Sequence, residues 1–187
     1  FKYLRKDNKK MKKKYLILFI ISLYLMQIPL FIDFIIINSE NYNEILENIL
    51  FNTSLAFLII STILGLVNLI IAFTNKQDNV IKTTMISKLI LIPYFITNFI
   101  ICMLLIMGFS FIFTILSAFI LIPLFILFTF MTMIVTSSYN ISYLISKFKH
   151  KEINIIVFII HFILQCVFIC DIIDTIYIYK TGENMIK

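Results

Sequence analysis

The chain has 187 residues, which at roughly 100 to 200 residues per domain is enough for one compact unit. Its residues are 61% hydrophobic and 14% charged, against about 45 to 50% apolar and 25% charged in a soluble domain. This composition excludes a soluble enzyme, and with only three glycines and three prolines it also excludes disordered and collagen-like chains. We therefore predict an all-helical, multi-pass protein of a cell membrane, with the lipid bilayer as its first partner.

Five apolar stretches are long enough to cross a membrane, because about 20 helical residues at about 1.5 Å each span a hydrocarbon core of roughly 30 Å. They cover residues 15–37, 50–73, 89–107, 112–135 and 155–177. The third and fourth are separated at Gly108, since residues 89–144 carry no charge and are too long for one span. The predicted organisation is a basic cytoplasmic tail (1–14), one transmembrane helical domain (15–177) and a short polar tail (178–187).

The N-terminal region resembles a signal peptide, with Met11 and three lysines before an apolar run. The run is longer than the apolar region of a typical signal peptide, and no cleavage site with small residues follows it. We therefore interpret it as an uncleaved first span. Because the chain begins with Phe1, it is either a fragment or starts at Met11.

Lysine and arginine residues predict the orientation, because cytoplasmic loops retain an excess of positive charge. With five spans, the inner segments hold 14 of the 16 cations, and the outer segments hold only Lys180 and Lys187. The first outer loop instead carries three acidic residues, namely Glu40, Glu44 and Glu47. We predict that the N-terminus lies inside and the C-terminus outside. The basic tail would lie against an anionic leaflet, and we expect no nucleic-acid partner.

His161 and Gln165 lie one turn apart on the same face of the fifth predicted span. One interpretation is a proton-binding or solute-binding position, because an imidazole titrates near neutral pH when a polar neighbour orients it. The other is a hydrogen-bonded clamp between helices, which contributes about 0.6 to 2 kcal/mol. We favour the clamp, since a proton pathway places several ionisable groups along one route.

Three aspartates, Asp33, Asp171 and Asp174, fall near the outer ends of the first and fifth predicted spans. Together with the glutamates of the first outer loop they would form an acidic rim that attracts cations or a cationic peptide. For Asp174 we favour the simpler interpretation, in which an acid near an outer end reaches the interface. For Asp33 and Asp171 we keep both the functional and the topological interpretation. The candidate intramembrane polar site therefore comprises His161, Gln165, Asp33 and Asp171.

Two helices carry small or polar residues on one face, which predicts close packing between helices. In the fourth span the face contains Thr129, Thr132, Thr136 and Asn140. In the second span it contains Ser54, Ser61, Gly65, Asn68 and Ala72. Both faces are interpreted as structural rather than substrate-lining, because serine and threonine hydroxyls often bond back to their own helix.

No set of residues predicts a metal site or a catalytic site. Cys102, Cys166 and Cys170 all lie inside predicted spans, where a thiol behaves as a small apolar group. His161 is about 140° around the helix from Cys166 at 100° per residue, so these side chains would not converge on one metal ion. The chain has no Gly-x-Ser-x-Gly, no P-loop, and only one aspartate-rich motif, Asp171 to Asp174. We expect no cofactor and no enzymatic activity.

The strings TSSYNI (136–141), HFILQ (161–165), DIID (171–174) and YIYK (177–180) resemble a family of small bacterial inner-membrane proteins of unknown function. The resemblance covers about the C-terminal half of the chain and implies a bacterial cytoplasmic membrane, with no activity to transfer.

The first hypothesis for the function is a non-enzymatic accessory, partner-binding or protective envelope protein, with a membrane-protein partner or a second copy of the chain. The alternative is a small proton- or cation-coupled transporter that uses His161 and Gln165. A third hypothesis, an enzyme acting on a lipid or prenyl substrate, would require a divalent metal held by Asp171 and Asp174.

Overall fold

A computed structural model describes the backbone of residues 2–37, 44–74, 81–107 and 112–184, and the side chains of residues 13–32, 44–74, 81–103 and 122–181. Every regular element within these ranges is a helix, so the predicted all-helical fold is confirmed for them. The helices are α1 (Lys2–Ile37), α2 (Glu44–Thr74), α3 (Ile81–Met107), α4 (Ile112–Lys149), α5 (Ile155–Leu164) and α6 (Cys170–Asn184).

Four of the described helices contain segments long and apolar enough to cross a membrane, namely Lys13–Ile32, Glu44–Thr74, Ile81–Met103 and Ile122–Lys149. The predicted break between the third and fourth spans agrees with the end of α3 at Met107 and the start of α4 at Ile112. Several helices are longer than predicted. In particular, α3 begins at Ile81 and not at Leu89, and α4 continues to Lys149.

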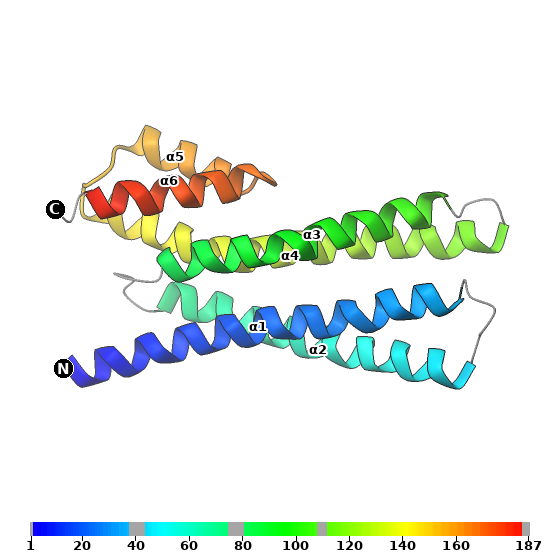
Figure 1. Cartoon of the computed structure of the whole chain (residues 1–187). Helices are drawn as coiled ribbons and strands as arrows, with labels where there is room; N and C mark the ends of the chain where they lie inside the picture. Colours follow the sequence, from blue (N-terminus) through cyan, green and yellow to red (C-terminus); the bar gives the residue numbers. More distant parts are fainter. Residues whose placement is uncertain (1, 38–43, 75–80, 108–111, 185–187) are drawn as a thin grey trace.

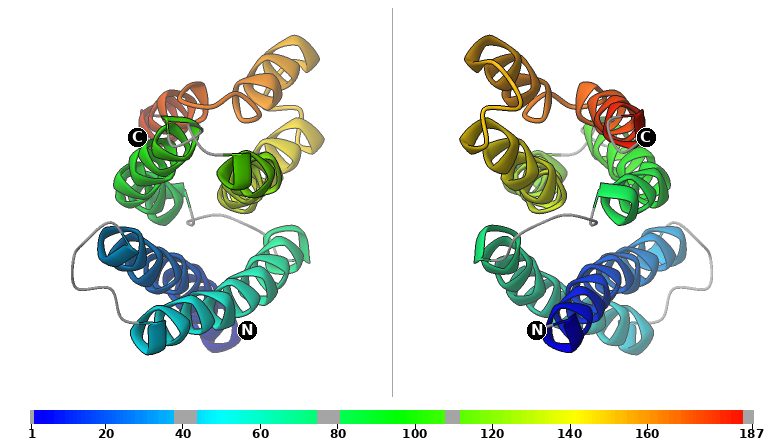
Figure 2. Two further views of the ribbon diagram at one scale, coloured as in Figure 1. Left: turned by 90° about the vertical axis from the view of Figure 1, so that its right-hand side faces the viewer. Right: turned by 90° about the vertical axis from the view of Figure 1, so that its left-hand side faces the viewer.

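The helices form three layers (Figures 1 and 2). Helices α1 and α2 make one antiparallel pair, and α3 and α4 make a second pair that packs on it. The short helices α5 and α6 lie on the far side of the second pair, with α6 against α3 and α5 against α4. We call α5 and α6, with the turn between them, the C-terminal hairpin.

The prediction of one continuous fifth span over residues 155–177 is wrong, because the structure divides this segment into α5 and α6. The backbone N–H of Gln165 bonds the carbonyls of His161 and Ile163, which closes α5. Ile169 then adopts a positive φ of 71°, a conformation that is rare for a β-branched residue. The turn contains neither glycine nor proline, so local sequence does not indicate it.

The hairpin also determines at which end of the bundle α6 finishes. Helix α6 runs back along α5, so the end of α6 lies at the same end of the bundle as the start of α1 (Figure 1). Five complete spans with the N-terminus inside and the C-terminus outside would place these two points at opposite ends. In the structure, the start of α5 and the end of α6 both lie at the end of the bundle where α1 begins.

The small-residue face predicted for α2 is buried, as expected, at Ser54, Ser61, Gly65, Asn68 and Ala72. A Cβ added at Gly65 would lie 3.3 Å from Phe19 Cε2 in α1 and 3.3 Å from Val135 Cγ2 in α4. Asn68 donates to the carbonyl of Tyr15 at 3.1 Å and accepts from the Tyr139 hydroxyl at 2.7 Å. This face therefore holds α1, α2 and α4 together by close approach and by one buried amide.

Replacing Gly65 with leucine is expected to destabilise the bundle, because the new side chain has no free space between Phe19 and Val135. Overpacking of this kind typically costs about 1 to 3 kcal/mol. The measurement is the free energy of unfolding in detergent micelles, with Ala56→Leu on the exposed side of the same helix as the control. Equal stability of the two variants would contradict the close approach seen at Gly65.

The threonine face of α4 behaves mainly as a packing surface. Thr132 donates to the Phe128 carbonyl at 2.9 Å, and Thr136 donates to the Thr132 carbonyl at 3.1 Å. Thr129 also bonds within α4 and in addition accepts from Asn98 Nδ2 of α3 at 3.2 Å. These bonds agree with the structural interpretation of the face. Only Asn140, at its far end, reaches the C-terminal hairpin.

Candidate functional site

A buried ion pair joins α3 to the C-terminal hairpin. Lys88 Nζ of α3 pairs with Asp171 Oδ1 of α6, and the two side chains are only 2% and 5% exposed. Lys88 Nζ also donates to Ser137 Oγ of α4 at 2.9 Å and to Gln165 Oε1 at 2.8 Å. An ammonium group has three donors, and here each has an acceptor from a different segment of the chain.

The side-chain amide of Gln165 connects this pair to the rest of the hairpin. Its Oε1 accepts from Lys88 and, at 3.2 Å, from Asn140 Nδ2. Its Nε2 donates to Asp174 Oδ2 at 2.6 Å and to Thr175 Oγ1 at 3.3 Å. Gln165 therefore bridges the side chains of Lys88 and Asp174.

The second acidic contact of the hairpin pairs Asp174 with His161. Nδ1 of His161 lies 2.5 Å from Asp174 Oδ1, and the imidazole ring stacks on Tyr177, with ring centroids 5.6 Å apart. The His161 side chain is 14% exposed, whereas the Asp174 side chain is 2% exposed. His161 is thus the most accessible ionisable group of the cluster. We call Lys88, Ser137, Asn140, His161, Gln165, Asp171, Asp174 and Thr175 the polar network.

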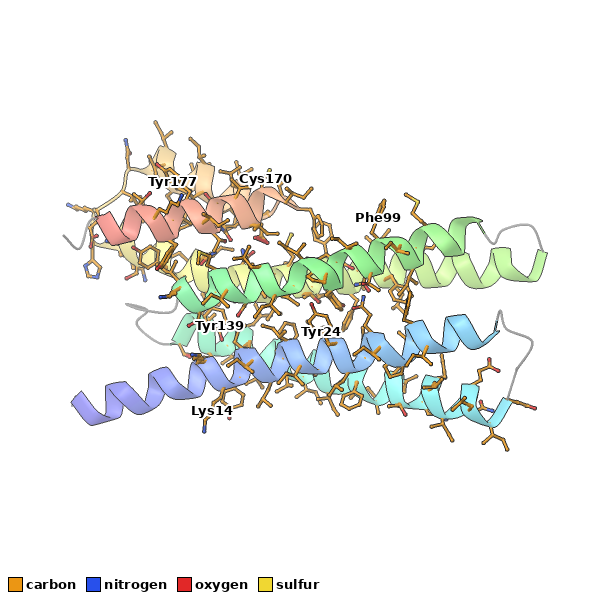
Figure 3. The ribbon with its side chains drawn as sticks, viewed as in Figure 1. Lys14, Tyr24, Phe99, Tyr139, Cys170 and Tyr177 are labelled. Atoms are coloured by element: carbon orange, nitrogen blue, oxygen red, sulfur yellow. The ribbon has the colours of Figure 1, made fainter. Side chains whose placement is uncertain are left out.

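Helix geometry explains why these residues meet. Asp171, Asp174 and Thr175 are spaced i, i+3 and i+4, which places them on one face of α6. That face lies against α3. Figure 3 labels two other residues of α6, Cys170 at its start and Tyr177 further along the helix. Thr175 Oγ1 accepts from Asn140 Nδ2 at 2.6 Å and donates to the Asp171 carbonyl at 2.7 Å. Each of the three side chains therefore has a polar partner on another helix.

The structure brings together three of the four residues of the predicted polar site, namely His161, Gln165 and Asp171. The side chain of the fourth, Asp33, lies outside the described residues. Asp174, which topology alone seemed to explain, is buried and paired with His161. The α4 face reaches this cluster through Asn140, whose Nδ2 donates to Gln165 Oε1 at 3.2 Å.

Sequence reasoning missed Lys88, which was counted as a loop cation because the third span was started at Leu89. Extending that helix backwards through residues 81–87, which contain neither glycine nor proline, would have placed Lys88 inside it. Thr175 was also missed. Within the described part of the chain, no three His, Cys, Asp or Glu side chains are arranged to hold a metal ion.

Burying the charged groups of the polar network costs free energy. Moving a charged side chain to the centre of a bilayer costs about 2.5 to 3.5 kcal/mol even on the mildest scale. A buried ion pair is also often no more stable than a well-packed apolar pair of similar volume. Packing alone therefore gives little reason to bury a lysine, two aspartates and a histidine together. The network instead brings two acid–base pairs, Lys88 with Asp171 and His161 with Asp174, into one set of hydrogen bonds.

Comparison with known proteins identifies one family. A model of a family of unknown function (DUF6652) matches residues 9–184. No curated protein and no solved structure shows significant similarity to the chain.

Proposed function

Because the chain belongs to this family of unknown function, we propose its role from its own geometry. The proposal is a small integral membrane protein that binds and releases protons at the polar network, as a proton-coupled transporter does. The observation that carries it is the alignment of four ionisable groups, from Lys88 and Asp171 through the Gln165 amide to Asp174 and His161. Several ionisable groups along one route are what a proton pathway in a membrane requires.

Placement in a membrane is supported by the four long apolar helices and by the large apolar side chains exposed on them, such as Ile63, Ile70 and Phe99. Such residues would contact lipid tails. Helix interruptions near polar sites also occur in transporters, where they expose backbone groups to a bound ion or solute. The turn between α5 and α6 is an interruption of this kind, and it lies directly beside the network.

The direction from which protons enter follows from the charge distribution. Basic residues stand near several helix ends on one side of the bundle, namely Lys13 and Lys14 of α1, Lys82 of α3, Lys147 and Lys149 of α4, and Lys180 of α6. These helix ends lie together in Figure 1, where α1 begins and α6 ends. By the positive-inside rule this end faces the cytoplasm. We infer that the hairpin is re-entrant from the cytoplasm and that His161, the most accessible group of the network, is the cytoplasmic entry.

A pH step applied to the purified protein in liposomes on a solid-supported membrane tests the proposal. Protons that enter a site inside the membrane move charge, so a transient current is expected even when the transported solute is unknown. Asp174→Asn removes the carboxylate paired with His161 and is expected to reduce the transient to that of empty liposomes.

The control is Asn98→Leu, which disrupts a buried amide contact with Gln27 but leaves every ionisable group of the network in place. This variant is expected to keep the current. Absence of a transient in the unmodified protein, or an unchanged transient in Asp174→Asn, would overturn the proposal.

A non-enzymatic accessory role is the second candidate, and α5 favours it. No described residue of α5 is buried, and Ile156, Ile160 and Ile163 are each more than half exposed. This apolar surface suits a membrane-protein partner or a second copy of the chain. Under this hypothesis the polar network only holds α5 in place, so a pH step would produce no current.

A further inference from the structure

A groove between α1 and α3 lies on the other side of α3 from the hairpin. Its volume is about 460 Å³, which is within the usual range of about 300 to 1,000 Å³ for ligand sites. The walls are mainly apolar and include Ile17, Ile21 and Leu25 from α1 and Ile86 and Ile90 from α3.

Two polar residues, Tyr24 and Ser87, line the groove together with its mainly apolar walls. Tyr24 extends from α1 toward α3 (Figure 3), and its hydroxyl donates to the Ile90 carbonyl at 2.5 Å. Ser87, another lining residue, is only 3% exposed. The apolar side chains on the rim are much more open, with Ile86 at 43% and Ile90 at 47%. The groove is therefore open along its length between α1 and α3, on the surface where lipid tails would lie.

The length of the groove matches one lipid chain. Its lining on α1 runs from Lys13 to Leu25, which at about 1.5 Å per residue is about 18 Å. One leaflet of a hydrocarbon core that is roughly 30 Å thick is about 15 Å deep. The groove thus extends along α1 by about the depth of a single leaflet.

Positive charge lies at one end of the groove. Lys13 lines it and is exposed, and the exposed Lys82 precedes the lining residue Thr83. Lys13 and Thr83 are the first lining residues on α1 and α3. Because both helices start at the same end of the bundle (Figure 1), Lys13 and Lys82 lie at the same end of the groove. Neither is in an ion pair with an acidic side chain among the residues that the structure describes.

We propose that this groove binds one anionic phospholipid of the inner leaflet, with an acyl chain along α1 and α3 and the phosphate at Lys13 and Lys82. Charge complementarity distinguishes this occupant from a zwitterionic lipid, since each lysine near the surface strengthens binding to anionic lipid by about fivefold. The proposal rests on placement in a membrane but not on proton binding at the network.

Tryptophan fluorescence provides a direct test, because the chain contains no tryptophan. Ile86→Trp places a reporter in the groove, and Ile70→Trp places a control on the exposed surface of α2, a similar number of residues from the end of its helix. Each variant is reconstituted in mixed phosphatidylglycerol and phosphatidylcholine vesicles in which one lipid class carries brominated chains, which quench the fluorescence.

The Ile86→Trp variant is expected to be quenched preferentially by brominated phosphatidylglycerol, with an apparent affinity at least about fivefold above phosphatidylcholine. Adding Lys13→Gln is expected to lower this preference by about fivefold, while Ile70→Trp shows none. Leu25→Trp, at the other end of the groove, repeats the measurement if Ile86→Trp does not fold.

Two results would overturn the proposal. Equal quenching by both lipids in the groove variants would show that the site does not select anionic lipid. Protection of both groove variants from either lipid would indicate that a second copy of the chain covers the groove. Since the proton-current assay uses different residues, failure of the lipid proposal is distinguishable from failure of the proposed function.

Discussion

Replacement of only one member of the buried pair, by Lys88→Met or Asp171→Leu, is expected to destabilise the protein by about 3 to 5 kcal/mol, because the remaining charge stays buried without its partner. The side chains of Lys88 and Asp171 are 2% and 5% exposed, so water cannot replace the lost contact. The measurement is the free energy of unfolding in mixed detergent micelles, where this loss corresponds to unfolding at a much lower denaturant fraction.

The double variant Lys88→Met with Asp171→Leu is expected to recover most of this loss. Apolar replacement of both partners in a buried pair is often neutral or stabilising, and the difference between the double and single variants gives the coupling energy. The matched control is the pair Lys147 and Glu152, whose side chains are 22% and 44% exposed. Lys147→Met is expected to change stability by no more than about 1 kcal/mol.

The double variant also separates the two candidate functions. It is expected to remain folded while losing part of the ionisable route, so the proton-coupled role predicts a reduced pH-step current. An accessory role predicts a folded protein with unchanged partner binding. Wild-type stability in both single variants would instead mean that Lys88 and Asp171 are not paired in the folded protein.

The end of α6 is expected to lie on the same side of the membrane as the start of α1. A chain with Cys102, Cys166 and Cys170 replaced by alanine provides the background for single-cysteine labelling with a membrane-impermeant maleimide. Lys180→Cys and Lys14→Cys are expected to be labelled from the same side, because the hairpin returns α6 to the end where α1 begins (Figure 1).

Glu44→Cys, at the start of α2, marks the opposite side and serves as the control. The outcome is all-or-none for each position, which makes this the most direct measurement of the fold in a bilayer. Labelling of Lys180→Cys together with Glu44→Cys would mean that residues 155–177 cross the membrane completely, as the five-span prediction requires.

The sequence alone was sufficient for the helical fold and for the small-residue face of α2. Both depend on local properties: continuous apolar runs predict helices, and Ser54, Ser61, Gly65, Asn68 and Ala72 recur with helical spacing. Helical periodicity determines which residues share a face, and polar or small residues in an otherwise apolar helix are the ones buried against neighbours. The structure confirms this face residue for residue.

Only the tertiary structure decided the turn at residues 165–169 and the pairing of Lys88. Residues 155–177 read as one apolar helix because the turn lacks glycine and proline, and local propensity there favours continuation. The polar groups of Gln165, Asp171 and Asp174 find partners on α3, α4 and α5 only when the chain folds back. The free energy of pairing buried polar groups depends on residues more than 70 positions away in the chain, such as Lys88 and Asp171, so no local pattern contains it.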